Sequence, residues 1–271
     1  MKIRFAALLV VLVATPAYMH AQGRGGRGAG GPAATPRAAA PIDVTGYWVS
    51  QIVDEWRFRV TPQKGDLPYL PLNPQARQIA NGWDPAKDEA EGNQCKAYGA
   101  VGVMQRPGRL HITWENDTTL RIDADAGTQT RTLHFAPPAG KDAAEKGAPS
   151  WQGYSVAQWQ TPPQGRGTID LGGVGNAPDG TQQQRTRTGT LKVVTTNMLP
   201  GYIRKNGAPY SANAVLTEYI QRLNGAQNDV YLTVTATVDD PNYLTGPFLR
   251  TYTFKSQADA SGWDPTSCLN R

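Results

Sequence analysis

Apolar and polar positions alternate along most of this chain from residue 46 onward. Successive side chains of a β-strand point to opposite faces, so this alternation predicts strands with one buried face. β-Branched and aromatic residues are frequent in the same segments, which favours strands over helices. The strands are expected at residues 46–53, 56–60, 100–105, 109–115, 119–125, 129–135, 153–159, 190–197, 215–223, 229–238 and 248–255.

Turn residues separate these segments, as at Pro107-Gly108 and Asn224-Gly225. One segment, residues 73–80, is predicted to form a helix, because Asn73 can cap it and Pro74 suits the first helical position. Many short strands with a single short helix indicate an all-β protein. We expect a single antiparallel barrel of about eight to ten strands, which is wide enough to hold a small ligand.

The first 42 residues differ in composition from the rest of the chain. A basic start and a nine-residue apolar run at residues 5–13 predict a secretory signal peptide over residues 1–21, since a membrane span needs about 20 apolar residues. Residues 22–42 are rich in Gly, Arg and Pro, which predicts a disordered leader. The barrel domain is expected at residues 43–271, with a long Gly- and Pro-rich loop at residues 160–189. We therefore expect a periplasmic or secreted protein with no integral membrane segment.

The charge of the chain is concentrated in the leader. The formal net charge is +5, and Arg24, Arg27 and Arg37 supply three of these charges. The Arg-Gly repeats around them resemble RNA-binding segments, but a flexible basic tether is favoured in an exported protein. The barrel domain is nearly neutral, so we expect no nucleic-acid partner.

Two cysteines, Cys95 and Cys268, are expected to pair as a disulfide in an exported protein. The sequence Gly-Trp-Asp-Pro occurs at residues 82–85 and again at residues 262–265, each time before one of the cysteines. We interpret the two copies as a structural clasp around the disulfide, and a paired aromatic platform for a sugar is the alternative.

The candidate metal and catalytic residues lie on the strands predicted between residues 109 and 135. His111, Asp123, Asp125 and His134 fall on the face opposite the apolar one, and their side chains suit a divalent transition metal such as zinc, iron or copper. The other interpretation is a solvated strand face above a buried apolar one. His111, Asp123 and His134, together with Glu218 farther along the chain, are the candidate catalytic residues.

A second group of candidates follows from charges on apolar faces. Arg131 shares its face with Leu133, and Glu218 shares its face with apolar neighbours, so both are expected inside the barrel. Buried charges are rare unless they are paired, which predicts an ion pair between the two side chains. A ligand pocket built on this pair would take Tyr154, Trp159 and Tyr210 as its aromatic walls.

Several segments together resemble a group of exported bacterial proteins of acidobacterial and proteobacterial type. The resemblance spans residues 43–268, and the segments that carry it are residues 95–100, 109–115, 120–135, 151–159, 191–196 and 240–247. It implies a lipocalin-like antiparallel barrel, and the segments contain no catalytic signature. The loop at residues 160–189 departs from the short turn that the group would have there.

Two functions remain open on these grounds, besides a purely structural envelope protein, which would fit the leader and the disulfide but leave the inward-facing charges unexplained. The first is an exported barrel that binds a small, partly apolar molecule in its lumen, with no cofactor. The alternative is a secreted metal-dependent lyase, isomerase or hydrolase that acts on a carbohydrate or aromatic compound through His111, Asp123 and His134.

Overall fold

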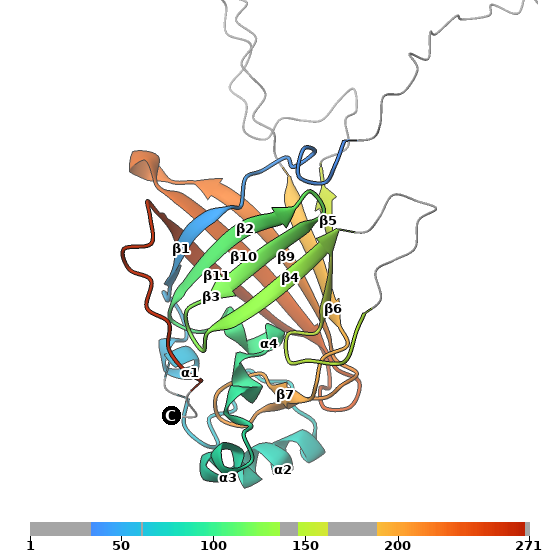
Figure 1. Ribbon diagram of the computed structural model, residues 1–271. Helices are drawn as coiled ribbons and strands as arrows, with labels where there is room; N and C mark the ends of the chain where they lie inside the picture. The colour runs from blue at the N-terminus through green and yellow to red at the C-terminus, as the bar shows by residue number, and fades with distance from the viewer. Residues whose placement is uncertain (1–33, 61, 136–145, 162–188, 269–271) are drawn as a thin grey trace, which may run out of the picture. The chain divides into compact units, whose positions relative to one another are not determined.

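The computed structural model describes residues 34–60, 62–135, 146–161 and 189–268, and their elements lie in the compact unit Ala34–Arg271. Within these residues nine strands form a closed barrel, which confirms the prediction of eight to ten strands (Figure 1). The strands are β1 (Gly46–Gln51), β2 (Arg109–Asn116), β3 (Thr119–Ala124), β4 (Gln129–Phe135), β5 (Tyr154–Gln160), β6 (Thr190–Thr196), β9 (Val215–Asn224), β10 (Val230–Asp239) and β11 (Phe248–Gln257). Around the barrel they follow the order β1-β11-β10-β9-β6-β5-β4-β3-β2.

The barrel is mixed, which corrects the expectation of a purely antiparallel one. Strands β4 and β5 run parallel, with Leu133 opposite Ser155 and Phe135 opposite Ala157, and the other eight pairs are antiparallel. A ring of antiparallel neighbours must contain an even number of strands, so a barrel of nine needs one parallel pair. The connection from β4 to β5 takes up residues 136–153, which suits the crossover that parallel strands require.

Alternate side chains are buried in most of the barrel strands, as the sequence pattern predicts, whereas β1 buries Trp48 alone. Leu120 and Ile122 of β3, Leu133 of β4 and Leu191 of β6 are buried, whereas the residues between them are mostly half-buried. Trp48 of β1 is also buried, and its indole Nε1 donates to the carbonyl of Val44 at 3.1 Å. The barrel interior is therefore lined with large side chains.

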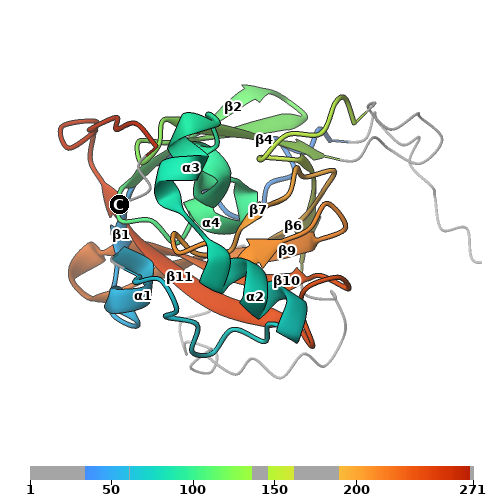
Figure 2. The ribbon, with the colours of Figure 1, turned by 90° about the horizontal axis from the view of Figure 1, so that it is seen from below.

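Several short elements gather at one end of the barrel, and Figure 2 shows α2, α3, α4 and β7 across this end. They are α1 (Trp56–Val60), α2 (Pro74–Gly82), α3 (Pro85–Ala90), the 3-10 helix η1 (Gln94–Tyr98), α4 (Ala100–Val103), and the two-stranded sheet of β7 (Gly201–Tyr202) and β8 (Pro209–Tyr210). A second 3-10 helix, η2 (Ala226–Asn228), joins β9 to β10.

The predicted helix is confirmed, but two predicted strands are helices. Asn73 caps α2 by accepting a hydrogen bond from the amide of Ala76, with Pro74 at the first position. Residues 56–60 form α1, although apolar and basic side chains alternate there. Residues 100–103 form α4, whose side chains are all buried. A short, continuously apolar run does not distinguish a buried strand from a buried helix.

The predicted disulfide is confirmed, since Cys95 of η1 is bonded to Cys268 with their Cα atoms 5.2 Å apart. The two Gly-Trp-Asp-Pro copies pack on different elements. The Trp263 ring contacts Tyr47 edge-on at 6.2 Å, whereas the Trp83 ring contacts Tyr202 edge-on at 6.3 Å. The second copy therefore covers the outer face of β1, and the first lies among the short elements at the end of the barrel.

The segment at residues 34–42, which the sequence assigns to the leader, contacts the barrel. The indole Nε1 of Trp159 donates to the carbonyl of Pro36 at 2.8 Å, and the amide of Arg37 donates to the carbonyl of Asp117 at 3.1 Å. The predicted signal peptide, the leader up to residue 33 and residues 162–188 of the predicted loop lie outside the described residues. Among the residues that are described, no helix is long and apolar enough to cross a membrane.

Candidate anion-binding site

The predicted buried ion pair crosses the barrel interior. Arg131 on β4 and Glu218 on β9 meet with Nη2–Oε2 and Nη1–Oε1 distances of 2.6 and 3.1 Å, and each side chain is only 2% exposed. Nη2 of Arg131 also donates to the hydroxyl of Thr195 at 3.3 Å, and that hydroxyl shares a hydrogen bond of 2.8 Å with the hydroxyl of Ser155. The two charges thus neutralise each other within a hydrogen-bonded group of the core.

The aromatic residues predicted to line a pocket around this pair lie in three different places. Tyr154 faces outward and stacks on His134 with ring centroids 5.0 Å apart. Trp159 is half-buried and packs against Phe135. Tyr210 of β8 is fully buried beyond the barrel strands, where burial raises the pKa of its phenol. The structure does not bring these three rings together around the ion pair.

The candidate metal ligands are also spread along the sheet. His111 lies opposite Asp123, but its ring stacks on Tyr47 at 4.1 Å. His134 lies opposite Thr119, at the other end of β3. Among the described residues, no group of three or more His, Cys, Asp or Glu side chains is arranged to hold a metal ion.

The two carboxylates of that candidate set have protein partners. Asp123 binds the guanidinium of Arg121 at 2.8 Å, and buried Asp125 accepts from the amide of Arg109 at 2.7 Å. The metal-dependent enzyme proposed from the sequence therefore gains no support from this geometry.

The most unusual chemistry lies among the short elements at the end of the barrel, where three arginines are buried. Arg59 of α1, Arg106 just after α4 and Arg204 between β7 and β8 are 5%, 3% and 1% exposed. We call these three residues the arginine cluster. The guanidinium of Arg59 lies 5.3 Å from the ring centroid of Tyr252, a buried residue of β11 that also interacts electrostatically with Arg106 and Arg204.

Few protein groups compensate these guanidinium charges. Arg59 pairs with Asp54 at 3.4 Å, and its Nε donates to a backbone carbonyl at 3.4 Å. Arg106 donates only from Nε, to a carbonyl at 3.3 Å, and Arg204 donates from Nη1 to Pro68 at 3.1 Å. Four buried nitrogens of the cluster have no hydrogen-bond partner among the described residues: Nη2 of Arg59, Nη1 and Nη2 of Arg106, and Nη2 of Arg204.

The three cations lie close enough to repel one another. Burial, with smaller contributions from the charges of Arg59 and Arg204, lowers the pKa of Arg106 to about 10. Burial likewise lowers the pKa of Arg204 to about 10. Both groups still carry a full charge at neutral pH. A buried charge without a partner is unfavourable by several kcal/mol, so this cluster is a candidate site for an anion.

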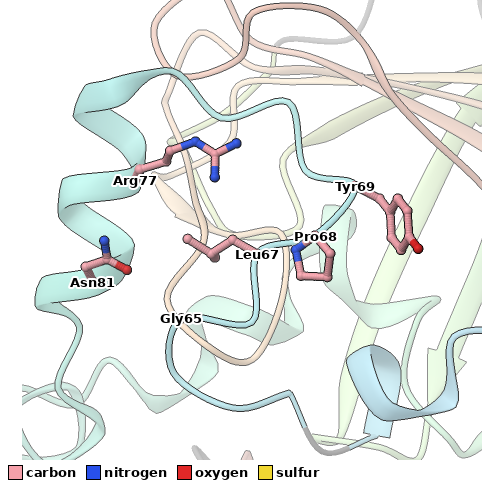
Figure 3. A pocket seen from close by; sticks show the side chains of 6 residues that line it. All are labelled: Gly65, Leu67, Pro68, Tyr69, Arg77 and Asn81. Carbon is pink, nitrogen blue, oxygen red and sulfur yellow. The ribbon is translucent and has the colours of Figure 1, made fainter.

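A surface pocket adjoins the cluster through Pro68. The pocket has a volume of about 440 Å³ and lies between α2 and the chain at residues 65–69 (Figure 3). Its lining residues are Gly65, Leu67, Pro68, Tyr69, Arg77 and Asn81. Pro68 contributes its ring to the pocket and its carbonyl to Arg204, so the same residue contacts both.

The arginine cluster could not be predicted from the sequence, although two of its three residues have a local signal. Arg59 ends an alternation of aromatic and basic residues that starts at Trp56, and Arg106 follows the apolar run of residues 100–104. Comparisons of the chain with protein-family models, with curated proteins and with solved structures find no match. The buried guanidinium groups of the arginine cluster are therefore the main indication of what this chain binds.

Proposed function

We propose that this chain is an exported barrel protein that binds a small, partly apolar molecule through an anionic group. The arginine cluster would hold the anionic group, in place of the lumen position expected from the sequence. The observation that carries this proposal is that three buried arginines present four nitrogens without hydrogen-bond partners among the described residues. Guanidinium groups form strong, charge-assisted hydrogen bonds with carboxylate, sulfate and phosphate oxygens.

Apolar groups beside the cluster would accept the rest of the ligand. The guanidinium of Arg204 lies 4.9 Å from the ring centroid of Phe58, and Phe58 in turn contacts Tyr69 edge-on at 6.4 Å. Val53 and Trp56 are exposed on the same segment of chain as Phe58. A ligand that combines an anionic group with a small ring would match both parts of this surface.

The disulfide supports the exported location, because such bonds persist in oxidising compartments. We further propose that the barrel is lipocalin-like in the broad sense that a closed sheet supports a ligand site at one end. In this proposal the barrel interior, with its buried ion pair, serves as a rigid scaffold.

Titration calorimetry tests the proposal with sulfate and phenyl phosphate as probes, at constant ionic strength and about pH 8, where phenyl phosphate is a dianion. We expect both to bind, phenyl phosphate more tightly, and Arg106→Met to lose at least tenfold in affinity for each. Arg222→Met is the matched control, because Arg222 is exposed on β9. Absence of binding to the wild-type chain, or equal losses in the two variants, would exclude the cluster as the site.

A further inference from the structure

Glu55 is a carboxylate that lies between Arg204 of the arginine cluster and a further cation, Arg250. It pairs with Arg250 at 2.9 Å (Nε–Oε2) and 3.0 Å (Nη2–Oε1). The same carboxylate lies 3.9 Å from Nη2 of Arg204, which is too far for a hydrogen bond. Glu55 thus partly compensates one member of the cluster without satisfying that nitrogen.

The backbone of Glu55 is linked to a second member of the cluster. Its carbonyl accepts hydrogen bonds from the amides of Phe58 and Arg59 at 2.9 and 3.1 Å, which starts helix α1. Any shift of Glu55 would therefore alter the position of Arg59. One residue connects the competing carboxylate, Arg204 and the helix that carries Arg59.

The segment around Glu55 is suited to movement. Glu55 has a φ of 47°, in the left-handed region that is unfavourable for residues other than glycine. The neighbouring apolar side chains of Val53 and Trp56 are 85% and 65% exposed, so little apolar contact would be lost if the segment shifted. The ion pairs of Glu55 are the main contacts that hold its side chain.

We infer that Glu55 is the charge-selecting residue of this site: the ligand's anionic group displaces its carboxylate from Arg204 and Arg250, so that dianions bind and monoanions do not. The inference rests on the function proposed above. Exchange of the Glu55 carboxylate for a monoanion replaces one negative charge by another. The electrostatic stabilisation of the arginine cluster therefore does not increase. A dianion such as a phosphate monoester group or a free sulfate ion brings one additional charge to Arg59 and Arg106. The ligand class is therefore a dianion.

Sulfate and perchlorate are matched probes, because both are tetrahedral oxyanions and they differ by one unit of charge. Calorimetry on the full chain at constant ionic strength should show sulfate binding and no perchlorate binding. Glu55→Gln should bind sulfate about tenfold more tightly and should bind perchlorate measurably. Glu115→Gln is the control, because Glu115 pairs with Arg121 on the outer face of the barrel and should leave both affinities unchanged.

The outcomes separate this inference from the proposed function. If the wild-type chain binds sulfate and Glu55→Gln changes neither affinity, the role of Glu55 is wrong and the anion site stands. If neither chain binds sulfate, both proposals are wrong.

Trp56 provides a second measurement on the wild-type chain in case Glu55→Gln does not fold. Sulfate should change the tryptophan emission of the wild-type chain but not that of Trp56→Phe, since displacement of Glu55 moves its neighbour. Sulfate binding with an identical emission change in both chains would overturn the inference.

Discussion

Arg131 and Glu218 are 87 residues apart in the sequence, yet their side chains meet across the barrel interior at 2.6 Å. Two strands, β5 and β6, separate β4 from β9 around the barrel, so the pair spans the interior rather than linking neighbouring strands. Both residues are essentially inaccessible to solvent. The pair therefore connects two sides of the barrel through desolvated charges.

Removal of one partner of this pair should be strongly destabilising. Arg131→Met leaves the Glu218 carboxylate buried without its cation, and we expect the free energy of unfolding to fall by about 3–5 kcal/mol. The double variant Arg131→Met/Glu218→Leu removes both charges and should recover most of that loss. Urea denaturation of the three chains measures the effect. If Arg131→Met were as stable as the wild type, the ion pair would not contribute the expected free energy of unfolding.

Loss of the disulfide should lower stability without removing the fold. Cys95 and Cys268 are separated by 173 residues in the sequence, and the chain-entropy model gives about 4–5 kcal/mol for closing a loop of this size. In Cys95→Ser/Cys268→Ser the nine barrel strands remain paired, so we expect the native far-ultraviolet circular dichroism spectrum with a lower urea midpoint. An unfolded double variant would show that the barrel depends on this bond.

Arg106 should reduce stability when no anion is bound. Its Nη1 and Nη2 atoms have no partner within the described chain, so Arg106→Met should raise the free energy of unfolding by about 1–3 kcal/mol in an anion-free buffer. Sulfate at 100 times the wild-type dissociation constant should stabilise the wild type by about 2.7 kcal/mol and the variant, which binds at least tenfold more weakly, by at most about 1.4 kcal/mol. Thermal and urea unfolding, each with and without sulfate, measure both effects. A destabilised variant in anion-free buffer would contradict the prediction.

Asp123 should contribute stability that is lost in acid. Burial alone would raise its pKa, but hydrogen bonds from Arg121 and Thr130 outweigh burial and hold the pKa below its ordinary value. The unfolded chain therefore takes up the proton first as the pH falls below about 4, and the contribution disappears as the pH drops through the folded pKa.

Asp123→Asn tests this pH dependence. The stability difference between wild type and variant should be constant at neutral pH and should shrink as the pH falls below about 4. Arg121→Met, which removes the main partner of Asp123, should weaken the same acid dependence. An Asp123→Asn chain that loses stability in acid as steeply as the wild type would contradict this assignment.

Local pattern determined the strands of the barrel. The alternation around Leu120, Ile122 and Leu133 specifies which side chains are buried, because the period of a strand is two wherever the strand lies. The cap of α2 at Asn73 is equally local, since the donor and acceptor are three residues apart. Even the ion pair of Arg131 with Glu218 could be predicted, because a charged side chain on a buried apolar face is unfavourable unless a side chain of opposite charge lies beside it.

Tertiary structure decided the remaining features. Nothing in the sequence of residues 100–104 distinguishes a strand from a helix, and the closed ring of other strands leaves this segment to form α4 at the barrel end. The parallel pair of β4 and β5 follows from the odd number of strands, which is a property of the whole ring. Arg59, Arg106 and Arg204 come from three separate elements, and each alone is an ordinary surface-type residue. Their common burial around Tyr252 is what supports the proposed anion site, because the energy of a charge depends on what surrounds it in space rather than along the chain.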